Sequence, residues 1–388
     1  MRRQLPVYSP ISASAVLATL GTRDLRPVLS DALRAQYAAR EAVLTASGTE
    51  ALTLALRLAV ARRPGKPVLL PGFACYDLVS AAVGAGAPVR LYDLDPHTLT
   101  PDAASLEASL VGGAAALVVA HLFGVPVPLD AMREAADGAG ALLIEDAAQA
   151  VGGRWDGRPL GSAGDLSVLS FGRGKGETGG GGGALLVRAE GGLADAARGA
   201  LAPPPASGLP YSVKLASQWG LGRPALFAIP HAIPGLRLGE TVYVPPRPPR
   251  EMPAVAARVL DVTRRATAVE SSHRAAVAAR YLEALGPLAA GRSVSVLPGA
   301  TAGWLRFPVL VQPDATRDRR GAAIGVSPAY PLPLRALPAL QPLLDAQPQT
   351  PGADLLARVL RTVPTHSLLS ARDEALLIEW MRTGEEIG

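Results

Sequence analysis

The sequence predicts an α/β protein in which a largely parallel sheet, covered by helices, is followed by a smaller α+β domain. Through the first two-thirds of the chain, short apolar runs alternate with helical patterns, which is typical of parallel strands joined by crossover helices. Proline-rich breaks follow, and the pattern then changes to long helices with few strands. The 388 residues are 49% hydrophobic and 18% charged, enough for a large folded core.

Seven apolar runs are the expected strands of the sheet. They are Ala42–Leu44, Val68–Leu70, Val89–Tyr92, Ala116–Ala120, Leu142–Glu145, Leu166–Phe171 and Ala184–Val187. Helical patterns lie between them, at Glu50–Ala61, Tyr76–Ala85 and Pro128–Gly138. The last of these ends in glycine, which is a typical helix stop.

Two proline-rich stretches, Leu201–Pro205 and Pro245–Pro249, interrupt the alternation. We place a domain boundary at the second. Residues 1–244 are then an N-terminal segment with the large domain, and residues 245–388 are a small C-terminal domain. The expected elements there are one long helix from Pro253 to about Leu285, strands near Ser293–Leu297 and Leu305–Val311, and helices near Ala353–Arg361 and Ser370–Met381.

Composition excludes several classes of protein. The one cysteine, Cys75, rules out an internal disulfide framework, and the five histidines are too widely spaced for a metal motif. The net charge of +5 comes from dispersed arginines, and aromatic residues make up only 4% of the chain. We therefore expect no nucleic-acid partner, and an acidic small-molecule substrate instead.

The chain shows no convincing signal peptide, so a cytoplasmic protein is expected. The most apolar segment, Leu215–Leu238, contains Arg223 and three prolines, which leaves no uncharged span of 18 residues. Contact of this segment with a membrane surface is an open alternative that we do not expect.

Lys175 is the first candidate for chemistry. The chain holds 35 arginines and three lysines, and Lys175 follows an apolar run and precedes a glycine tract. Unlike arginine, a lysine amine can lose its proton and attack a carbonyl carbon. The position alone also fits a solvated loop lysine, so its neighbours must decide between the two.

Two further motifs supply the rest of a site. At Ser47-Gly48-Thr49 a strand gives way to a helix whose first N–H groups can bind a phosphate, although an ordinary helix cap has the same pattern. At Glu145-Asp146 an apolar strand ends in two acids, with Gln149 one turn later. One acid there can pair with a protonated ring nitrogen, or can simply cap a helix.

The glycine tract is open to misinterpretation. Gly174-x-Gly176-x-x-Gly179 has the letters of a dinucleotide fingerprint, but a strand rather than a helix is expected after it. The tract more plausibly lets the backbone pass close to a ligand. A phosphate cup, an acid for a ring nitrogen and a Schiff-base lysine are together what pyridoxal phosphate requires of a protein.

The chain resembles the DegT–StrS group of nucleotide-sugar aminotransferases, which are fold type I pyridoxal-phosphate enzymes. The match is strong over residues 40–190 and weak over 300–385. The segments that carry it are Ser47–Leu52, Pro71–Phe73, Ala85–Val89, Asp93–Leu99, His121–Gly124, Glu145–Gln149, Gly161–Asp165, Ser170-Phe171 with Lys175, Tyr330–Leu334 and Pro351–Asp354.

The resemblance implies a homodimer with pyridoxal phosphate bound at each subunit interface, and no metal. The amino donor would be glutamate and the acceptor a nucleotide-linked keto sugar, in polysaccharide or secondary-metabolite biosynthesis. It implies that Lys175 is the catalytic, Schiff-base lysine and that Asp146 keeps the ring nitrogen protonated. The other implied cofactor contacts are Gly48, Thr49 and Ser170 at the phosphate, and Cys75 and Gln149 at the ring.

The departures from the family pattern leave three points open. Cys75 stands where an aromatic residue stacks on the ring, so Phe73 or Tyr76 is an alternative. The family's Gly-x-Asn-x-Arg block, which contacts the partner subunit's phosphate, has only Leu238–Tyr243 as its nearest counterpart. Other pyridoxal-phosphate chemistry, such as elimination or decarboxylation, and a non-catalytic binding or regulatory module therefore remain alternative functions. Arg306 is a candidate for binding a substrate carboxylate or a plain surface cation.

Overall fold

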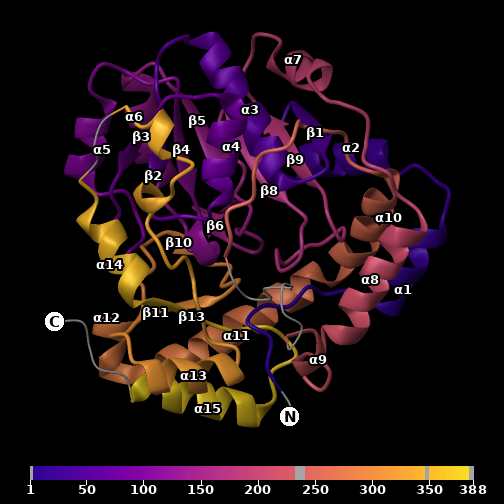
Figure 1. Ribbon diagram of the computed structural model, residues 1–388, viewed down its shortest axis with the longest axis vertical. Coiled ribbons are helices and arrows are strands. Elements are labelled where there is room, and N and C mark those ends of the chain that lie inside the picture. Colours follow the sequence, from indigo (N-terminus) through magenta and orange to yellow (C-terminus); the bar gives the residue numbers. More distant parts are fainter. Residues whose placement is uncertain (1–2, 232–240, 346–348, 384–388) are drawn as a thin grey trace.

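The computed structural model describes residues 3–231, 241–345 and 349–383, and its centre is a seven-stranded sheet (Figure 1). The strand order is β1-β9-β8-β5-β4-β2-β3. All pairings are parallel except those of β9 with β1 and β8. The predicted mostly parallel sheet of seven strands is confirmed. The strands are β1 (Glu41–Thr45), β2 (Val68–Pro71), β3 (Val89–Tyr92), β4 (Ala116–Ala120), β5 (Leu142–Asp146), β8 (Leu166–Ser170) and β9 (Gly183–Val187).

Helices cover the sheet, which explains why its inner strands are continuous apolar runs. Every residue of β4 and β9 is buried, as expected for strands with both faces covered. The crossover helices are α3 (Gly48–Arg62), α4 (Asp77–Ala85), α5 (Ala103–Leu110) and α6 (Leu129–Gly138). The longest, α3, packs against α4, β8 and β9, so its first turn is held rigidly over the sheet.

The C-terminal part builds a small antiparallel sheet below the large one (Figure 1). Its order is β11-β13-β12, formed by Phe307–Leu310, Leu360–Val363 and Ser327–Pro328. The helices of this part are α11 (Thr267–Leu285), α12 (Ala289–Arg292), α13 (Ala315–Ala323), α14 (Pro351–Val359) and α15 (Ala371–Arg382). This arrangement agrees with the predicted smaller α+β unit, while the boundary at residue 245 stays a prediction.

The predicted single helix from Pro253 to Leu285 is wrong, because the chain forms two helices there. Helix α10 (Ala254–Thr263) and α11 are separated by a short 3-10 turn at Arg264–Ala266. They pack against different partners: α10 contacts α1 (Ala13–Leu17) and α2 (Arg26–Gln36), whereas α11 contacts α15.

Two smaller predictions in this part are also wrong. Ser293–Leu297 is not a strand, because Ser293 makes only an isolated bridge to Val309 and the Ser295 N–H bonds to the His97 carbonyl. The helix expected to reach Arg361 ends at Val359, and the next residues join β13. The sequence analysis also missed elements in the described segments, namely α1, α2, α7 (Leu193–Gly199), α8 (Leu209–Leu221), α9 (Ala228–His231), α13 and the short sheet of β6 (Arg154–Trp155), β7 (Arg158–Pro159) and β10 (Ala300–Thr301).

Candidate active site

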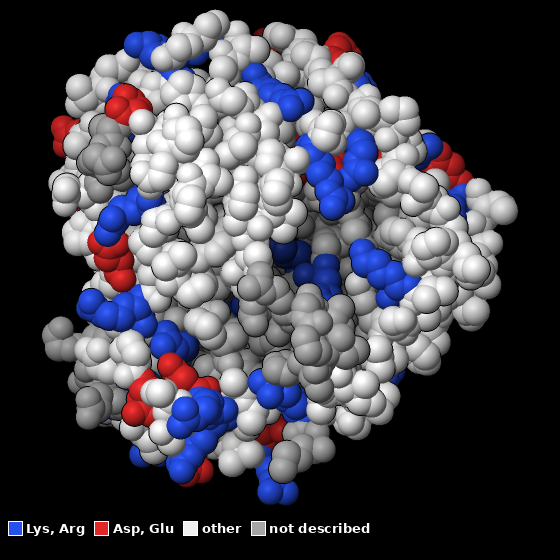
Figure 2. All heavy atoms as spheres, viewed as in Figure 1, with Lys and Arg blue, Asp and Glu red and all other residues white. Residues whose placement is uncertain are grey.

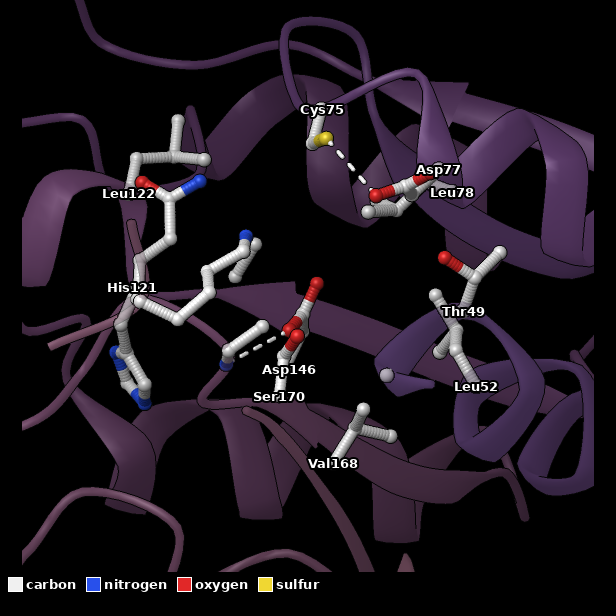
Figure 3. A pocket seen from close by; sticks show the side chains of 15 residues that line it. Thr49, Leu52, Cys75, Asp77, Leu78, His121, Leu122, Asp146, Val168 and Ser170 are labelled. Carbon is white, nitrogen blue, oxygen red and sulfur yellow. Dashed lines mark hydrogen bonds between the residues drawn. The ribbon is translucent and has the colours of Figure 1, made fainter. Parts of the chain in front are cut away.

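A pocket opens at the carboxyl ends of the parallel strands, where α/β proteins bind their ligands (Figure 3). The structure brings every candidate site residue to its lining, although they come from distant parts of the chain. These residues are Gly48, Thr49, Cys75, Asp146, Gln149, Ser170 and Lys175. Their gathering follows from topology, because β5 and β8 are neighbours and α3 starts beside them.

The first turn of α3 forms one end of the pocket. The Ser47 hydroxyl caps the helix by accepting the Glu50 N–H at 3.1 Å, which leaves the Thr49 amide without a partner inside the helix. Gly48 is needed for close approach, since a Cβ there would stand 2.6 Å from the Cβ of Ser170. A helix start with a free amide and two hydroxyls nearby is suited to a phosphate group.

An ion pair fixes this turn from outside the pocket. Glu50 is buried and accepts from the Arg250 backbone N–H and from its guanidinium, both at 2.8 Å. Arg250 therefore ties the start of α3 to the segment that leads into α10. The segment Leu238–Tyr243, named above as the nearest counterpart of the Gly-x-Asn-x-Arg block, lies partly outside the described residues.

Asp146 ends β5 and extends toward the middle of the pocket (Figure 3). The one hydrogen bond to its carboxylate within the described ranges comes from the Ala148 N–H, at 3.0 Å. Burial raises the pKa of the Asp146 carboxyl, while the Ala148 N–H and the charge of Lys175 act in the opposite direction. A carboxylate that is destabilised by burial gains from a positively charged partner, such as a protonated ring nitrogen.

Lys175 lines the same pocket, and its amine has no hydrogen-bond or ion-pair partner among residues 3–231, 241–345 and 349–383. The loop around it is well anchored. The Gly174 N–H donates to the Ser9 hydroxyl at 2.6 Å, and the Glu177 N–H donates to the Lys175 carbonyl at 2.8 Å. Gly176 has a φ of +74°, a conformation that favours glycine and lets the loop turn directly after the lysine.

A buried histidine–glutamate pair supports the floor of the pocket. His121 Nδ1 accepts the Val127 N–H at 3.1 Å, so its proton lies on Nε2, which faces Glu145 Oε1 at 3.0 Å. Burial alone would raise the pKa of Glu145. The hydrogen bond and electrostatic attraction of His121 and the N–H groups of Gly161 and Ala163 outweigh burial and lower the pKa of Glu145 to about 2. Glu145 is therefore a structural anion, and its neighbour Asp146 is the acid at the pocket.

Tyr330, which the sequence analysis included only in a weak family match, contacts a residue of the pocket lining. The Gln149 amide accepts from the Phe123 N–H at 3.0 Å and donates to the Tyr330 hydroxyl at 2.7 Å. Tyr330 also stacks on Phe123, with ring centroids 5.8 Å apart. No local signal could have found this contact, because 181 residues separate Gln149 from Tyr330.

The structure distinguishes the three candidates for the ring-stacking position by where they lie. Cys75 lines the pocket and its thiol lies 3.5 Å from Asp77 Oδ2. Phe73 and Tyr76 instead pack on Tyr330, at centroid distances of 5.2 and 6.3 Å. Burial raises the pKa of the Cys75 thiol to about 12, so it faces the pocket as a neutral group.

Other kinds of site find no support in the described part of the chain. No group of three or more His, Cys, Asp or Glu side chains there is arranged to hold a metal ion. No helix within those residues is long and apolar enough to cross a membrane. The segment Leu215–Leu238 is described only as far as residue 231, where α8 and α9 lie. The glycine tract leads into β9 without a helix, so the dinucleotide motif is absent as predicted.

Fold and pocket together define an α/β protein with an anion cup, a partly buried carboxylate and an unpaired lysine amine at one ligand site. The model of the DegT/DnrJ/EryC1/StrS aminotransferase family matches residues 26–201 of this chain. The recognised resemblance is thus confirmed, and with it the fold. The donor set fits pyridoxal phosphate, because it offers one group to each of the phosphate, the ring nitrogen and the aldehyde of that cofactor.

Named relatives match part of the chain. The L-glutamine:2-deoxy-scyllo-inosose aminotransferase of Streptoalloteichus tenebrarius is 41% identical over 145 residues, which is 37% of this chain and 34% of that protein. A UDP-N-acetyl-3-dehydro-α-D-glucosamine 3-aminotransferase of Acidithiobacillus ferrooxidans is 34% identical over 154 residues, or 40% and 42% of the two chains. The matches thus span about a third to two-fifths of these relatives' length.

Solved structures match over nearly the whole chain. The aminotransferase TlmJ from Streptoalloteichus hindustanus has a TM-score of 0.75 and 26% identity, covering 98% of both chains. DesV from S. venezuelae, solved in complex with a ketimine intermediate, has a TM-score of 0.73 and 25% identity, covering 95% of this chain and 92% of that one. The C-terminal part, which the family model leaves unmatched, therefore has the same fold.

Proposed function

We propose that this chain is a pyridoxal-phosphate-dependent aminotransferase that moves an amino group from an amino acid to a keto sugar. The observation that carries the proposal is the meeting of Lys175, Asp146 and the first turn of α3 in one pocket. Each of these groups lacks a full set of protein partners in the described chain, and each has a counterpart on the cofactor. The family and the names of its relatives agree with this activity.

In this proposal the cofactor supplies an electron sink for the bond broken at the donor's α-carbon. The protein's own residues do the remaining work. Thr49 and Ser170 hold the phosphate with their N–H and hydroxyl groups, and Gly48 permits that close packing. Asp146 keeps a proton on the ring nitrogen. Lys175 Nζ would act as the base that takes the proton from the donor's α-carbon.

The substrate class follows from charge and from the relatives. Lys and Arg side chains line a hollow on one face of the molecule (Figure 2). A positive hollow favours an acidic substrate such as a nucleotide-linked keto sugar. The relatives act on an inosose and on a UDP-linked sugar, so we propose a keto sugar or cyclitol acceptor and a glutamate or glutamine donor, in secondary-metabolite or polysaccharide biosynthesis.

We also propose that the working form is a homodimer. Several large apolar side chains are exposed in the described parts of residues 209–244, and a second subunit packed on them would remove apolar surface from water. They are Leu209 and Val213 on α8, Leu226 and Ile229 near α9, and Val242 and Val244. Sedimentation of the purified protein tests this directly, and a monomer at micromolar concentration would contradict it.

The test of the activity is an absorbance spectrum of the purified protein mixed with pyridoxal phosphate, compared with Lys175→Ala. We expect a visible band in the wild type that the variant lacks, and its loss on adding L-glutamate. Lys66→Ala is the matched control, because Lys66 is a lysine outside the pocket that donates to the Gly112 carbonyl. A band that persists with every amino donor would instead favour elimination or decarboxylation. The absence of a band in the wild type would favour a binding module.

A further inference from the structure

Ser9 is far from Lys175 in the sequence but lies beside the loop that carries it. The Ser9 side chain is buried, and its hydroxyl accepts the Gly174 N–H at 2.6 Å. Val7 reaches the same glycine, because a Cβ added at Gly174 would stand 2.8 Å from a methyl carbon of Val7. The N-terminal residues therefore pack directly against the residue that precedes Lys175.

The loop has few other polar restraints. Residues 172–176 include three glycines in five positions, which gives this backbone wide conformational freedom. Within the described parts of the chain, the bond from Gly174 to Ser9 is the one hydrogen bond that ties these five residues to a distant segment. Their other bond, from the Glu177 N–H to the Lys175 carbonyl, is local. The Ser9 hydroxyl is thus the main polar restraint on the backbone around Lys175.

Ser9 is itself held by the C-terminal part of the chain. Gln4 Nε2 donates to Asp373 Oδ2 at 3.2 Å, and His366 Nε2 lies 3.0 Å from the Leu5 carbonyl oxygen. These bonds fix the residues that lead into Ser9. They also mean that the small C-terminal unit reaches the loop of Lys175 through residues 4–9.

The chain is fixed on the other side of Ser9 as well. Pro10 follows it, and a proline restricts the residue before it to an extended backbone. Ile11 is buried in a small apolar cluster with Ala15, Leu215 and Val259. The position of the Ser9 hydroxyl is therefore set by the fold from both directions.

The place of the Lys175 amine matters for the chemistry proposed above. A lysine side chain is a flexible four-carbon stem, so the direction of its amine depends on where the backbone places its root. The amine has no partner of its own among the described residues. A base must lie within hydrogen-bond reach of the proton it takes, and a shift of about 1 Å can cost a large part of the rate. The protein must therefore fix Lys175 through its backbone.

We propose that Ser9 is a positioning residue for Lys175, whose hydroxyl holds the Gly174 backbone so that the lysine amine lies at its working place in the pocket. The inference rests on the proposed aminotransferase function and adds to it a residue from outside the large sheet. Ser9 does not line the described pocket and acts through Gly174. Its loss should therefore slow the steps at Lys175 and leave ligand affinity unchanged.

The first experiment follows the donor half-reaction in wild type, Ser9→Ala and Ser9→Cys, each loaded with pyridoxal phosphate. Loss of the visible band at increasing L-glutamate gives a limiting rate constant and a donor dissociation constant separately. We expect Ser9→Ala to lower the rate constant roughly 10- to 100-fold and to keep the dissociation constant within about two-fold of the wild type. Ser9→Cys, whose sulfur is a weaker acceptor, should lie between the two.

A second readout needs no cofactor. Hydrogen–deuterium exchange with mass spectrometry follows the peptide that contains Gly174 in the cofactor-free protein. The Gly174 N–H is bonded and its residue is buried, so it should exchange slowly in the wild type. In Ser9→Ala it should exchange at least roughly 10-fold faster, while the peptide that contains β4 keeps its wild-type exchange.

Ser12→Ala is the matched control. Ser12 belongs to the same N-terminal stretch, and its hydroxyl also accepts a backbone N–H, that of Ala15 at 3.2 Å. This bond caps the start of α1 and does not involve the loop of Lys175. Ser12→Ala should therefore keep the wild-type rate constant and the wild-type exchange at Gly174.

The outcomes separate the inference from the proposed function. If the wild type forms the visible band and loses it with L-glutamate, the proposed function stands. A wild-type rate constant in folded Ser9→Ala, whatever its melting temperature, then overturns the role of Ser9 and leaves its bond a structural one. An equal loss of rate in Ser12→Ala, or a weakened donor with an unchanged rate constant, contradicts the inference too.

Two further results have a fixed meaning. If Ser9→Ala does not fold, the same criteria apply to Ser9→Cys. If the wild type forms no band, the proposed function fails, and the exchange of Gly174 in the cofactor-free variants still decides whether Ser9 holds the loop.

Discussion

His121 Nε2 lies 3.0 Å from Glu145 Oε1, and both side chains are fully buried directly beside the Asp146 that faces the pocket. Glu145 also accepts hydrogen bonds from the N–H groups of Gly161, Ala163 and Gly164 and from the Ser167 hydroxyl. One anion therefore fixes the end of β5, the loop after β7 and the His121 ring together.

Replacing Glu145 by Gln should destabilise the protein by about 3 kcal/mol, because donors arranged around an anion then face an amide N–H₂. The pH dependence follows from the lowered pKa. The Glu145 carboxylate stabilises the folded state fully at pH values above its ordinary pKa of 4.5, and this stabilisation is lost as the pH falls toward about 2. Denaturant unfolding at several pH values measures it. Equal free energies of unfolding of wild type and Glu145→Gln at pH 7 would show that the His121–Glu145 pair does not stabilise the fold.

Protonation of His366 should lower the free energy of unfolding over a higher pH range than protonation of Glu145 does. Burial lowers its pKa from 6.5 to about 4, although the bond from Nε2 to the Leu5 carbonyl acts the other way. The unfolded chain binds a proton below pH 6.5 and the folded chain does not, so stability is lost between pH 6.5 and about 4, by up to about 3 kcal/mol. His366→Gln should flatten the stability profile in this window. An NMR titration showing the His366 ring protonated near pH 6.5 would contradict the prediction.

Gly48→Ala should weaken binding of the cofactor's phosphate. The added Cβ would stand 2.6 Å from the Ser170 Cβ, which forces the helix start and β8 apart. We expect the dissociation constant for pyridoxal phosphate to rise at least roughly 10-fold, as a loss of about 1.4 kcal/mol implies. The control is Gly138→Ala at the end of α6, where a Cβ has open space. Equal cofactor affinity in both variants would show that Gly48 has no role in binding the phosphate.

Asp146→Asn should retain the fold and lose turnover. The amide still accepts the Ala148 N–H but carries no negative charge to keep a ring nitrogen protonated. Loss of one preorganised electrostatic group predicts a kcat lower by roughly 100-fold or more. Steady-state kinetics with the cofactor at saturation measure it. A kcat within a few-fold of the wild type would assign Asp146 to a structural role.

The core of the fold was predictable because its signals are local. Strands such as Ala116–Ala120 and the apolar start of Leu142–Asp146 are buried on both faces, and this burial appears in the sequence as a continuous apolar run. The break at Arg264–Ala266 was not predictable, because both flanking stretches have helical patterns and only their packing partners differ.

The site was predictable in part for the same reason. Ser47-Gly48-Thr49 and Lys175 follow strands and Asp146 ends one, so the rule that ligands bind at the carboxyl ends of strands places all of them at one edge of the sheet. The contact of Tyr330 with Gln149 spans 181 residues, and nothing in the local sequence marks it. Glu145 was placed at the strand end, but only the structure shows that it faces inward and Asp146 faces the pocket.

The most direct test of the central claim is whether the Lys175 amine bonds covalently to the cofactor. The protein is loaded with pyridoxal phosphate, reduced with borohydride, digested and analysed by mass spectrometry. We predict that the pyridoxyl mass is found on the peptide that contains Lys175. Label on Lys66 or Lys214 instead, or no label with the cofactor otherwise bound, would contradict the account.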